Sequence, residues 1–479
     1  MWKGVGCMFK FKEHGSDVRT EIVAGLTTFM TMSYIVALNP NILTNFGADG
    51  GQPLWNAVFM ATCLASAIGT ICMAFYADKP FVMAPGMGLN SFFAVVVANI
   101  AILTGLSYTD SFQSALCIIL IEGILFIILS LVRVREKIVE AIPLGIRMGI
   151  GPAIGLMLMN IGFGSNAGIY SSNGGPFYVM RDFFGAMTPK IIKDAAGDGY
   201  PQLVMYVVTM FVGLFIIILL DLRGKKSAVL IGMISASILY WIGEIVVLHN
   251  NPFLALKSAH WAPPFKDMVE LTLFKFDFRD FFSIGLFTAI TLIITFCMID
   301  MFDTIGTLVG AASRADMLDE EGRMPKMKEA LTSDAVGTIC GSLSGTSTVT
   351  TFVESATGVE AGGRSGLTAL TAGVMFLLCM FISPIVALIP APATSSALIY
   401  VGIIMLMGLK NIDLQDKFDV VPCMIMLITM PISGSIGHGI GLGLITYTVM
   451  KVFTGKAKDV SILCYIISIL FLIKFFVVV

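Results

Sequence analysis

The sequence AIGTIC at residues 67–72 returns, with one substitution, as AVGTIC at residues 335–340. An unusually polar stretch follows each copy: APGMGLN at residues 84–90 and GTSTVTTFVES at residues 345–355. Six residues can match by chance in a chain rich in glycine, alanine and isoleucine, but the matching polar neighbours argue against chance. We therefore predict that the chain consists of two halves with the same order of segments.

The composition indicates that both halves lie in a membrane. Of 479 residues, 56% are hydrophobic and 13% are charged, and the mean hydropathy is +0.88, far above that of water-soluble domains. A spanning helix needs roughly 20 apolar residues, and such windows recur from Ile22 to the C-terminus, so no folded domain outside the membrane is expected.

Charge and cysteine content exclude other classes of function. The net charge of -2 argues against a nucleic-acid partner, which would require a basic patch. The nine cysteines lie mostly in apolar stretches without metal-ligand spacing. We therefore predict neither a metal nor a cofactor.

Apolar windows predict seven membrane segments in each half. The first seven lie near residues 22–39, 56–77, 81–103, 111–132, 145–163, 202–220 and 228–248. The next seven lie near residues 282–311, 329–345, 347–362, 366–389, 395–409, 418–434 and 438–453. The last apolar run, residues 460–479, is interpreted either as an additional span or as a helix along the edge of the protein.

The distribution of lysine and arginine predicts a cytoplasmic N-terminus. The loops holding Arg133, Arg223 and Arg314 are basic, whereas the loop 40–55 has no positive charge, and positively charged loops tend to stay in the cytoplasm. The first twenty residues carry several charges, so no cleavable signal peptide is expected ahead of the first span. Because seven is an odd number, the second half begins on the opposite side of the membrane, which permits an inverted repeat.

Segments three and ten are predicted to be discontinuous. Pro85, Gly86 and Gly88 interrupt helix formation in the first, and the Thr/Ser run of the second favours irregular backbone. Irregular backbone at membrane depth is tolerated only where protein or a water-filled cavity satisfies it. Helices that begin near Asn90 and Phe352 would point partial positive charge into the middle of the membrane, where a polar ligand can bind. Alternatively, the glycines only permit close helix packing.

Acidic residues inside apolar segments are the strongest candidates for a functional site. Asp300, Asp303 and Thr307 share one face of the eighth segment because they are three and four residues apart, and Glu354 is the expected partner across a cavity. Intramembrane acids are costly and are usually retained for a function. The alternatives are that Asp303 or Glu354 only accepts hydrogen bonds from backbone at a helix start, and that Asp300 only orients its neighbour.

Several long motifs resemble one family of membrane proteins. These are FKEHG (11–15), DVRTE (17–21), AGLTTF (24–29), APGMGLN (84–90), DMFDTIGT (300–307) and TTFVES (350–355). In this order they closely resemble the AzgA-like purine permeases, which belong to the nucleobase-cation symporter class that includes xanthine and uracil permeases. The resemblance extends from about residue 9 to about residue 455.

The resemblance implies an all-α polytopic fold of fourteen segments in two inverted seven-segment repeats. A core domain would comprise residues 1–134 and 280–390, a gate domain residues 135–279 and 391–455, and a hydrophobic segment residues 456–479. The family also implies a multi-pass protein of the cell membrane and an elevator-like movement of the core against the gate, which is often anchored by a homodimer.

The resemblance further implies proton symport of hypoxanthine, guanine or adenine, with critical positions at Asn90, Asp303 and Glu354. Thr307 stands where uracil-type relatives have a histidine, which favours a purine. We predict that Asp303, Glu354 and Asp300 take part in proton coupling, with Glu354 as the main base-binding carboxylate and Asp303 as the proton carrier. The predicted substrate-binding residues are Glu354, Asn90, Asp303, Phe302, Thr304, Thr351 and Ser355, supported by Thr307, Gly86 and Gly88.

Two other classes of function compete with a nucleobase transporter. An anion exchanger or channel on the same inverted-repeat fold would require a positive or uncharged site, whereas this sequence supplies Asp303 and Glu354. An enzyme would require a nucleophile and base, or metal-ligating histidines, at one depth. The four histidines lie outside the middle of the predicted spans, so we do not expect an enzyme.

Overall fold

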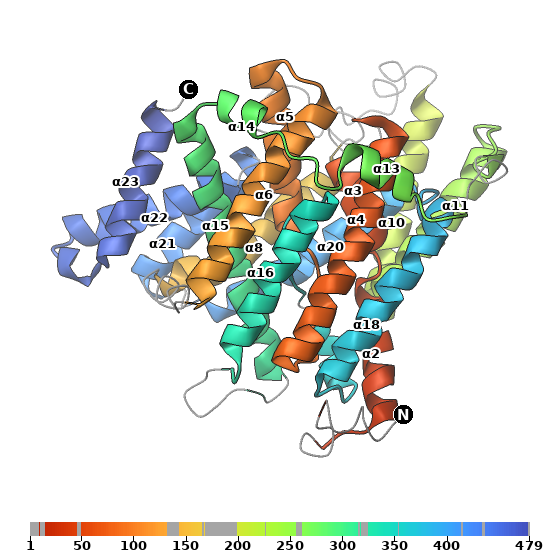
Figure 1. Ribbon diagram of the computed structural model, residues 1–479, viewed down its shortest axis with the longest axis horizontal. Helices are drawn as coiled ribbons and strands as arrows, with labels where there is room; N and C mark the ends of the chain where they lie inside the picture. Colours follow the sequence, from red (N-terminus) through yellow and green to blue (C-terminus); the bar gives the residue numbers. More distant parts are fainter. Residues whose placement is uncertain are drawn as a thin grey trace.

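The computed structural model shows a predominantly helical protein whose longest helices run side by side (Figure 1). It describes residues 9, 15–45, 49–131, 143–164, 167, 199–225, 227–254, 261–314, 317, 324–352, 354–412, 415–433 and 436–477. Nine helices in this described part are long and apolar enough to cross a membrane. The number of fourteen segments stays a prediction.

The first half contains helices separated by one short strand. They are α2 (Val18–Met32), α3 (Ile35–Leu43), α4 (Gly51–Cys72), β1 (Met83–Pro85), α5 (Met87–Thr104), α6 (Tyr108–Leu131), α8 (Leu144–Gly162), α10 (Tyr200–Leu222) and α11 (Ala228–Val246). A π-helical turn, Met73–Ala77, extends α4. The sequence predicted one segment at 22–39, where the structure has α2 and α3 separated by a turn at Ser33 and Tyr34.

The second half repeats this order. It contains α15 (Leu286–Arg314), α16 (Met327–Ser344), β2 (Val349–Thr351), α17 (Ser355–Glu360), α18 (Gly366–Cys379), α19 (Ser383–Val386), α20 (Ala391–Leu406), α21 (Lys417–Ser433), α22 (Ile436–Phe453) and α23 (Ile462–Val477). Two short helices, α13 (Phe265–Leu271) and α14 (Phe278–Ser283), connect the halves across one end of the molecule (Figure 1). There the Asn56 side chain donates to Asp267 Oδ2 at 2.6 Å.

The helices form two bundles, each drawn from both halves. In the first bundle α16 packs against α4 and α6, α18 packs against α2 and α4, and α15 packs against α6. In the second bundle α8 packs against α20 and α21, α10 packs against α11 and α20, and α21 packs against α22. The predicted boundaries of a core and a gate domain stay predictions.

Both bundles depend on glycines at close backbone contacts. A Cβ on Gly155 of α8 would lie 2.6 Å from the Gly402 carbonyl oxygen of α20, and a Cβ on Gly402 would lie 2.5 Å from the Gly155 carbonyl oxygen. In the first bundle, a Cβ on Gly123 of α6 would lie 2.6 Å from Ile339 Cγ1. Small residues let helices approach closely where lipid supplies no hydrophobic driving force. Close packing is therefore one role of the glycine-rich composition.

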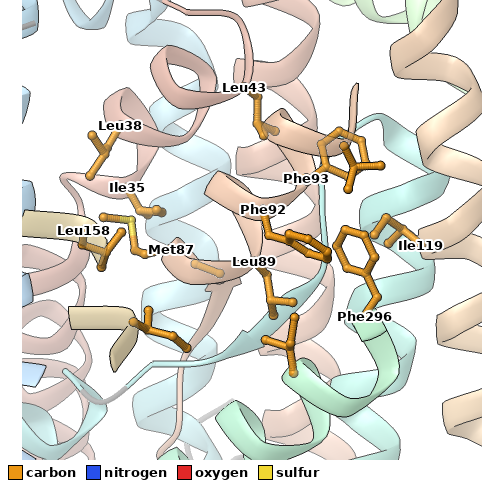
Figure 2. Packing of buried hydrophobic residues seen from close by; sticks show 14 of the residues in the cluster. Ile35, Leu38, Leu43, Met87, Leu89, Phe92, Phe93, Ile119, Leu158 and Phe296 are labelled. Atoms are coloured by element: carbon orange, nitrogen blue, oxygen red, sulfur yellow. The ribbon is translucent and has the colours of Figure 1, made fainter. Parts of the chain in front are cut away.

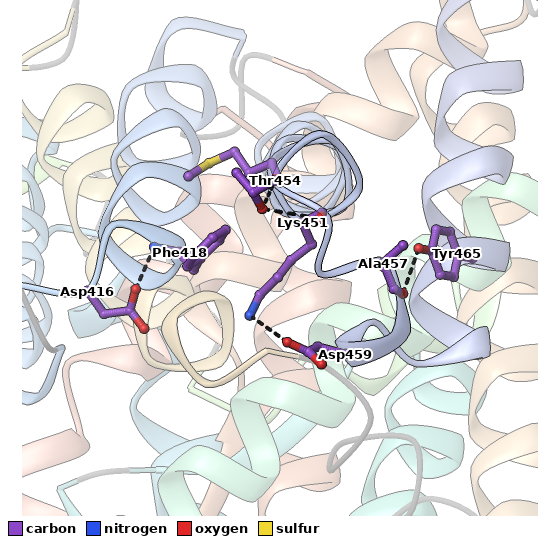
Figure 3. A network of polar contacts seen from close by, with 8 residues as sticks. Asp416, Phe418, Lys451, Thr454, Ala457, Asp459 and Tyr465 are labelled. Carbon is purple, nitrogen blue, oxygen red and sulfur yellow. Dashed lines mark hydrogen bonds and ion pairs between the residues drawn. The ribbon is translucent and has the colours of Figure 1, made fainter.

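The C-terminal apolar run forms helix α23, which packs against α22 at the edge of the molecule (Figure 1). Figure 3 shows how their connection is held: Lys451 Nζ lies 3.7 Å from Asp459 Oδ2, and Tyr465 donates to the Ala457 carbonyl at 2.9 Å. The same ammonium lies 4.3 Å from the centroid of the Phe418 ring. The apolar part of α23, Ile462–Ile473, is shorter than the nine candidate spans.

Candidate functional site

The two interrupted segments meet in a short antiparallel pair of strands. β1 pairs with β2 in the register Met83 with Thr351, Ala84 with Thr350, and Pro85 with Val349. The Gly86 N–H extends the pairing by donating to the Thr348 carbonyl at 3.0 Å. All six strand residues are buried. The ladder satisfies part of the non-helical backbone at this depth, as membrane burial requires.

The repeated hexapeptides support this pair of strands from both sides. Thr70 Oγ1 accepts from the Met83 N–H at 2.9 Å, and Thr338 Oγ1 donates to the Val349 carbonyl at 3.2 Å. A Cβ on Gly69 would lie 3.2 Å from the Cα of Gly337. Each copy thus holds the strand of its own half, while the two copies touch at their glycines. This arrangement explains why the same hexapeptide occurs twice.

Helices continue from both strands, and each begins within three residues of the position that the sequence predicted. Helix α5 begins at Met87, before Asn90, and α17 begins at Ser355, after Phe352. Helix α17 has only six residues, because Ala361 and Gly362 follow it in a turn. Glu354 is the residue immediately before α17 and is partly exposed.

The Asp303 side chain extends from α15 towards the paired strands β1 and β2, which we call the strand crossing. A Cβ on Gly86 would lie 3.1 Å from Thr350 Oγ1 and 3.5 Å from Asp303 Oδ2, so these three residues converge. Asp303 is partly exposed, and its helix α15 packs against β2 and against α17, which begins directly after Glu354. The structure therefore places the two acids on neighbouring elements, and Gly86 leaves room for Asp303.

Asp300 lies one turn away, in a buried cluster of its own. Thr304 Oγ1 lies 3.1 Å from Asp300 Oδ1 and 3.0 Å from Oδ1 of Asp334 on α16. All three side chains are buried. A hydroxyl has one hydrogen to donate, so it can satisfy only one of the two carboxylates at a time. Thr304 therefore bridges two acids, whereas the sequence predicted it to contact substrate.

Asn90 is fully buried and engaged with the protein. The Ser347 hydroxyl donates to Asn90 Oδ1, and Asn90 Nδ2 donates to the Pro85 carbonyl at 3.2 Å. Nearby, Thr348 donates to Glu122 Oε2 at 3.1 Å. These contacts connect the loop before β2 to α5 and α6. Substrate contact by Asn90 stays a prediction.

The remaining predicted residues occupy different environments. The Thr351 hydroxyl is buried and has no hydrogen-bond partner in the part of the chain that the structure describes. Ser355 Oγ accepts from the Val82 N–H at 2.9 Å, and Thr307 Oγ1 donates to the Asp303 carbonyl at 2.8 Å. Of the three, Thr351 is therefore the one whose hydroxyl lacks a protein partner.

The phenylalanines that could stack on the face of a bound ring also lie in different environments. The ring centroids of Phe92 and Phe296 are 4.7 Å apart (Figure 2), and those of Phe93 and Phe112 are 5.2 Å apart. Phe92 and Phe93 therefore belong to the buried apolar core. Phe352 is buried beside the strand crossing. The side chain of Phe302 lies outside what the structure describes.

Two residues near the site were not singled out from the sequence. The Tyr34 hydroxyl donates to Glu354 Oε1 at 2.6 Å, and Asp334 contacts Thr304. Asp334 carried a usable signal, since it is an acid inside a predicted span just before the second hexapeptide. Tyr34 carried none, because tyrosine is ordinary in membrane helices and its partner is 320 residues away.

The chemistry of the site is that of a binding surface rich in hydrogen-bond acceptors. Among the described residues no group of three or more His, Cys, Asp and Glu is arranged to hold a metal ion. Two partly exposed carboxylates, Asp303 and Glu354, and the hydroxyl of Thr351 lie on three adjoining elements. Such a surface can accept hydrogen bonds from the N–H groups of a small polar molecule.

Comparison with known proteins shows which family the chain belongs to. A family model named Xan_ur_permease, described as a permease family, matches residues 19–431. The chain belongs to this family. The match confirms the resemblance predicted from the motifs, and with nine apolar helices it makes this permease a multi-pass membrane protein.

Relatives of this permease match over nearly their full length. The adenine permease AdeP of Escherichia coli is 37% identical, covering 98% of this chain and 95% of AdeP. The guanine/hypoxanthine permease PbuO of Bacillus subtilis is 35% identical, covering 98% of this chain and all of PbuO. A putative permease of Methanocaldococcus jannaschii is 38% identical over 98% of this chain.

Solved structures show the fold of the permease in more distant proteins. The transmembrane domain of the cyanobacterial bicarbonate transporter BicA superposes with a TM-score of 0.59 at 14% identity, covering 89% of this chain and 97% of that chain. The murine anion transporter Slc26a9 in its inward-facing state has a TM-score of 0.59 at 12% identity, covering 91% of this chain and 68% of that chain. The fold of this permease is thus shared with BicA and Slc26a9.

Proposed function

We propose that this permease is a secondary active transporter that imports purine nucleobases, namely hypoxanthine, guanine or adenine, together with protons. The observation that supports the proposal is that Asp303 on α15 and Glu354, directly before α17, lie on elements that pack against each other beside the paired strands β1 and β2. The names of the relatives support purines as the substrate class. The site offers the acceptors that a purine requires.

The proposed binding mode follows from hydrogen-bond complementarity. A purine presents N–H donors and ring-nitrogen acceptors on the edge of a flat ring. Glu354 would accept from an N–H group, and Thr351, whose hydroxyl can both donate and accept, would bind a neighbouring atom. Asn90 completes the proposed site if its amide turns away from Ser347. Hydrogen bonds from N–H donors to a carboxylate are roughly twice as strong as those between neutral groups. The proposed site would therefore bind a ligand with N–H donors in preference to an anion.

Proton coupling is proposed to use the acids of α15. Asp303 is the proposed proton carrier because it lies at the strand crossing within electrostatic range of Glu354. Two carboxylates that share one region cannot both ionise easily. Binding of a proton at Asp303 would therefore favour the ionised form of Glu354 that binds the base. Asp300 and its partner Asp334 would extend this acidic region towards α16.

Movement is proposed to be of the elevator type, with the first bundle sliding against the second. Gly88 of α5 faces Ile154 of α8 at this boundary: a Cβ on Gly88 would lie 2.7 Å from Ile154 Cγ2. In this proposal the second bundle is the fixed part and is anchored in a homodimer. Because Gly88 has no side chain, it presents no obstacle to movement of Ile154 along α5.

Uptake into proteoliposomes tests the proposal. We expect accumulation of radiolabelled hypoxanthine driven by an inward proton gradient, inhibited by unlabelled adenine or guanine more than by uracil or xanthine, and abolished by a protonophore. Asp303→Asn and Glu354→Gln should abolish accumulation, whereas Glu360→Gln, an exposed acid at the end of α17, should not. Competition by no purine would refute the substrate class, and full accumulation by either site variant would refute its assigned role.

The alternative of an anion exchanger or channel predicts the reverse selectivity. Its support is the shared fold of BicA and Slc26a9, which shows architecture alone. The carboxylates at Asp303 and Glu354 oppose it because they repel an anion. Uptake of labelled bicarbonate or sulfate by the same proteoliposomes, with no hypoxanthine uptake, would favour the alternative.

A further inference from the structure

Tyr34 links the first membrane segment to the proposed base-binding carboxylate through a side-chain hydrogen bond. Its hydroxyl donates to Glu354 Oε1 at 2.6 Å. The Tyr34 side chain is fully buried, whereas Glu354 is partly exposed. Glu354 thus has one oxygen held by the protein and a side chain that still reaches accessible space.

The position of Tyr34 comes from a break in the first segment. Helix α2 ends at Met32 and α3 begins at Ile35, with Ser33 and Tyr34 in the turn between them. Regular hydrogen bonding resumes when the Leu38 N–H donates to the Tyr34 carbonyl at 2.9 Å. The first segment is therefore interrupted at the residue that reaches Glu354.

Packing of α2 against α17 fixes the distance between the two side chains. Thr31 Oγ1 and Thr357 Oγ1 are 3.1 Å apart, and each of these hydroxyls also donates to a carbonyl within its own segment. A Cβ on Gly358 would collide with Thr28 Oγ1, so α17 can lie this close only with glycine there. Because α17 begins directly after Glu354, this packing brings the carboxylate to the phenol.

A phenol donor has two effects on a carboxylate that binds a ligand. It holds the side chain in one orientation, so that less conformational freedom is lost when the ligand binds. It also occupies only part of the acceptor capacity of the carboxylate, because two oxygens offer about four lone-pair sites. The lone-pair sites of the carboxylate that the protein does not occupy can accept from an N–H group of the substrate.

We infer that Tyr34 is a positioning residue that presents Glu354 to the N–H edge of the transported heterocycle and thereby determines substrate affinity. This inference rests on the proposed function and adds a residue from the first segment to the site. It follows that the affinity for bases with an N–H donor on the bound edge depends on Tyr34. The affinity for bases alkylated at that nitrogen does not.

Tyr34→Phe removes the hydroxyl and keeps the ring. In proteoliposomes we expect the KM for hypoxanthine uptake to rise about tenfold, as for the loss of a hydrogen bond to a charged group, with Vmax within about twofold of the parent. The matched control is Tyr108→Phe, because Tyr108 is also largely buried and donates to a backbone carbonyl, that of Leu43, at 2.7 Å. The control should leave KM unchanged.

A second substitution tests the inference even if the Tyr34→Phe variant does not fold. Incorporation of 3,5-difluorotyrosine at position 34 keeps the phenol and makes its hydroxyl more acidic, so KM should change by at least about threefold, and the same residue at position 108 should have no effect. Unchanged KM in the position 34 variants, or a fall in Vmax alone, would overturn the inference. Absence of uptake by the parent protein would instead refute the proposed function.

Discussion

Gly69 and Gly337 face each other at the centre of the first bundle, where a Cβ on Gly69 would lie 3.2 Å from the Cα of Gly337. Each belongs to one copy of the repeated hexapeptide. The side chains of Met83 and Val349, from the two paired strands, lie within 3.6 Å of the same Cβ position. The contact between the halves and the strand crossing are therefore one packed unit.

Gly69→Val is expected to prevent folding. Its methyl groups would push the backbones of α4 and α16 apart and separate β1 from β2, and overpacking of a well-packed core typically costs about 1–3 kcal/mol or more. Yield of monodisperse protein by size-exclusion chromatography measures the effect. Gly199→Val is the control, because Gly199 lies just before α10 and, in the part of the chain that the structure describes, nothing beyond its chain neighbours lies within 4 Å of a Cβ there. Equal yields for the two variants would contradict the close contact.

The contact between Gly155 and Gly402 predicts a similar effect in the second bundle. Gly155→Ala and Gly402→Ala each place a methyl group 2.5–2.6 Å from a carbonyl oxygen, so α8 and α20 must move apart, and we expect the Tm to fall clearly. Gly199→Ala should lower the Tm far less, because Gly199 precedes α10 and no described residue beyond its chain neighbours lies within 4 Å of a Cβ there. Differential scanning fluorimetry of the purified variants separates these outcomes.

Thr304→Val should destabilise the protein more than Thr307→Val. Thr304 is the hydroxyl between Asp300 and Asp334, and its loss costs a donor to a buried charged group, about 1–3 kcal/mol. Thr307, one turn along α15, donates only to carbonyls of its own helix. Thermal unfolding of both variants measures the difference. A larger effect at Thr307 would argue against a structural role of the Asp300 and Asp334 cluster.

Gly88→Ala tests whether the two bundles move against each other. The added methyl group would lie 2.7 Å from Ile154 Cγ2, at the boundary between bundles. We expect the Vmax of uptake to fall about tenfold with a smaller change in KM, because the added methyl group meets Ile154 rather than Asp303 or Glu354. Ile154→Ala in the Gly88→Ala background should restore most of the rate by removing the obstructing side chain. No recovery in the double variant would speak against an elevator movement at this contact.

Lys79, which lies between α4 and β1, predicts a dependence of stability on pH. Burial, followed by repulsion from Lys326, lowers the pKa of the Lys79 ammonium, while Asp78 and Glu329 act in the opposite direction. The charged form of Lys79 is therefore less favourable in the folded than in the unfolded protein, and this lowers the stability of the folded protein at neutral pH. The loss of stability is relieved as the pH rises from the folded pKa towards 10.5, because the folded protein then releases the proton first. Lys79→Gln should raise the Tm at pH 7 and show a smaller further gain at pH 9.5 than the parent.

Some features could be predicted from the sequence because they depend on local composition. Long apolar windows gave the spans, and acids inside them identified Asp303 and Glu354. Proline and glycine at Pro85 and Gly86 marked an interruption, since they disrupt helices wherever they occur. The start of α17 at Ser355 lies close to the predicted start near Phe352, and its exact residue depends on the strand pairing beside it.

Other features of the candidate site required packing between distant segments. The sequence predicted Thr304 and Ser355 as substrate contacts, whereas the structure shows Thr304 between two acids and Ser355 bonded to the backbone of Val82. A hydroxyl has the same chemistry in either role, so only its neighbours distinguish them. The predicted contacts of Thr304 and Ser355 with substrate stay untested.

The sequence by itself determined that the chain is a membrane protein and that it belongs with the permeases, because hydropathy and motifs are properties of the residues in order. The tertiary structure alone decided that Tyr34 holds Glu354 and that Asp334 joins Asp300. These pairs come from segments far apart in the chain, and their meeting depends on how glycines let the helices approach. Solvent preference is a property of each segment, whereas a binding site is a property of their arrangement.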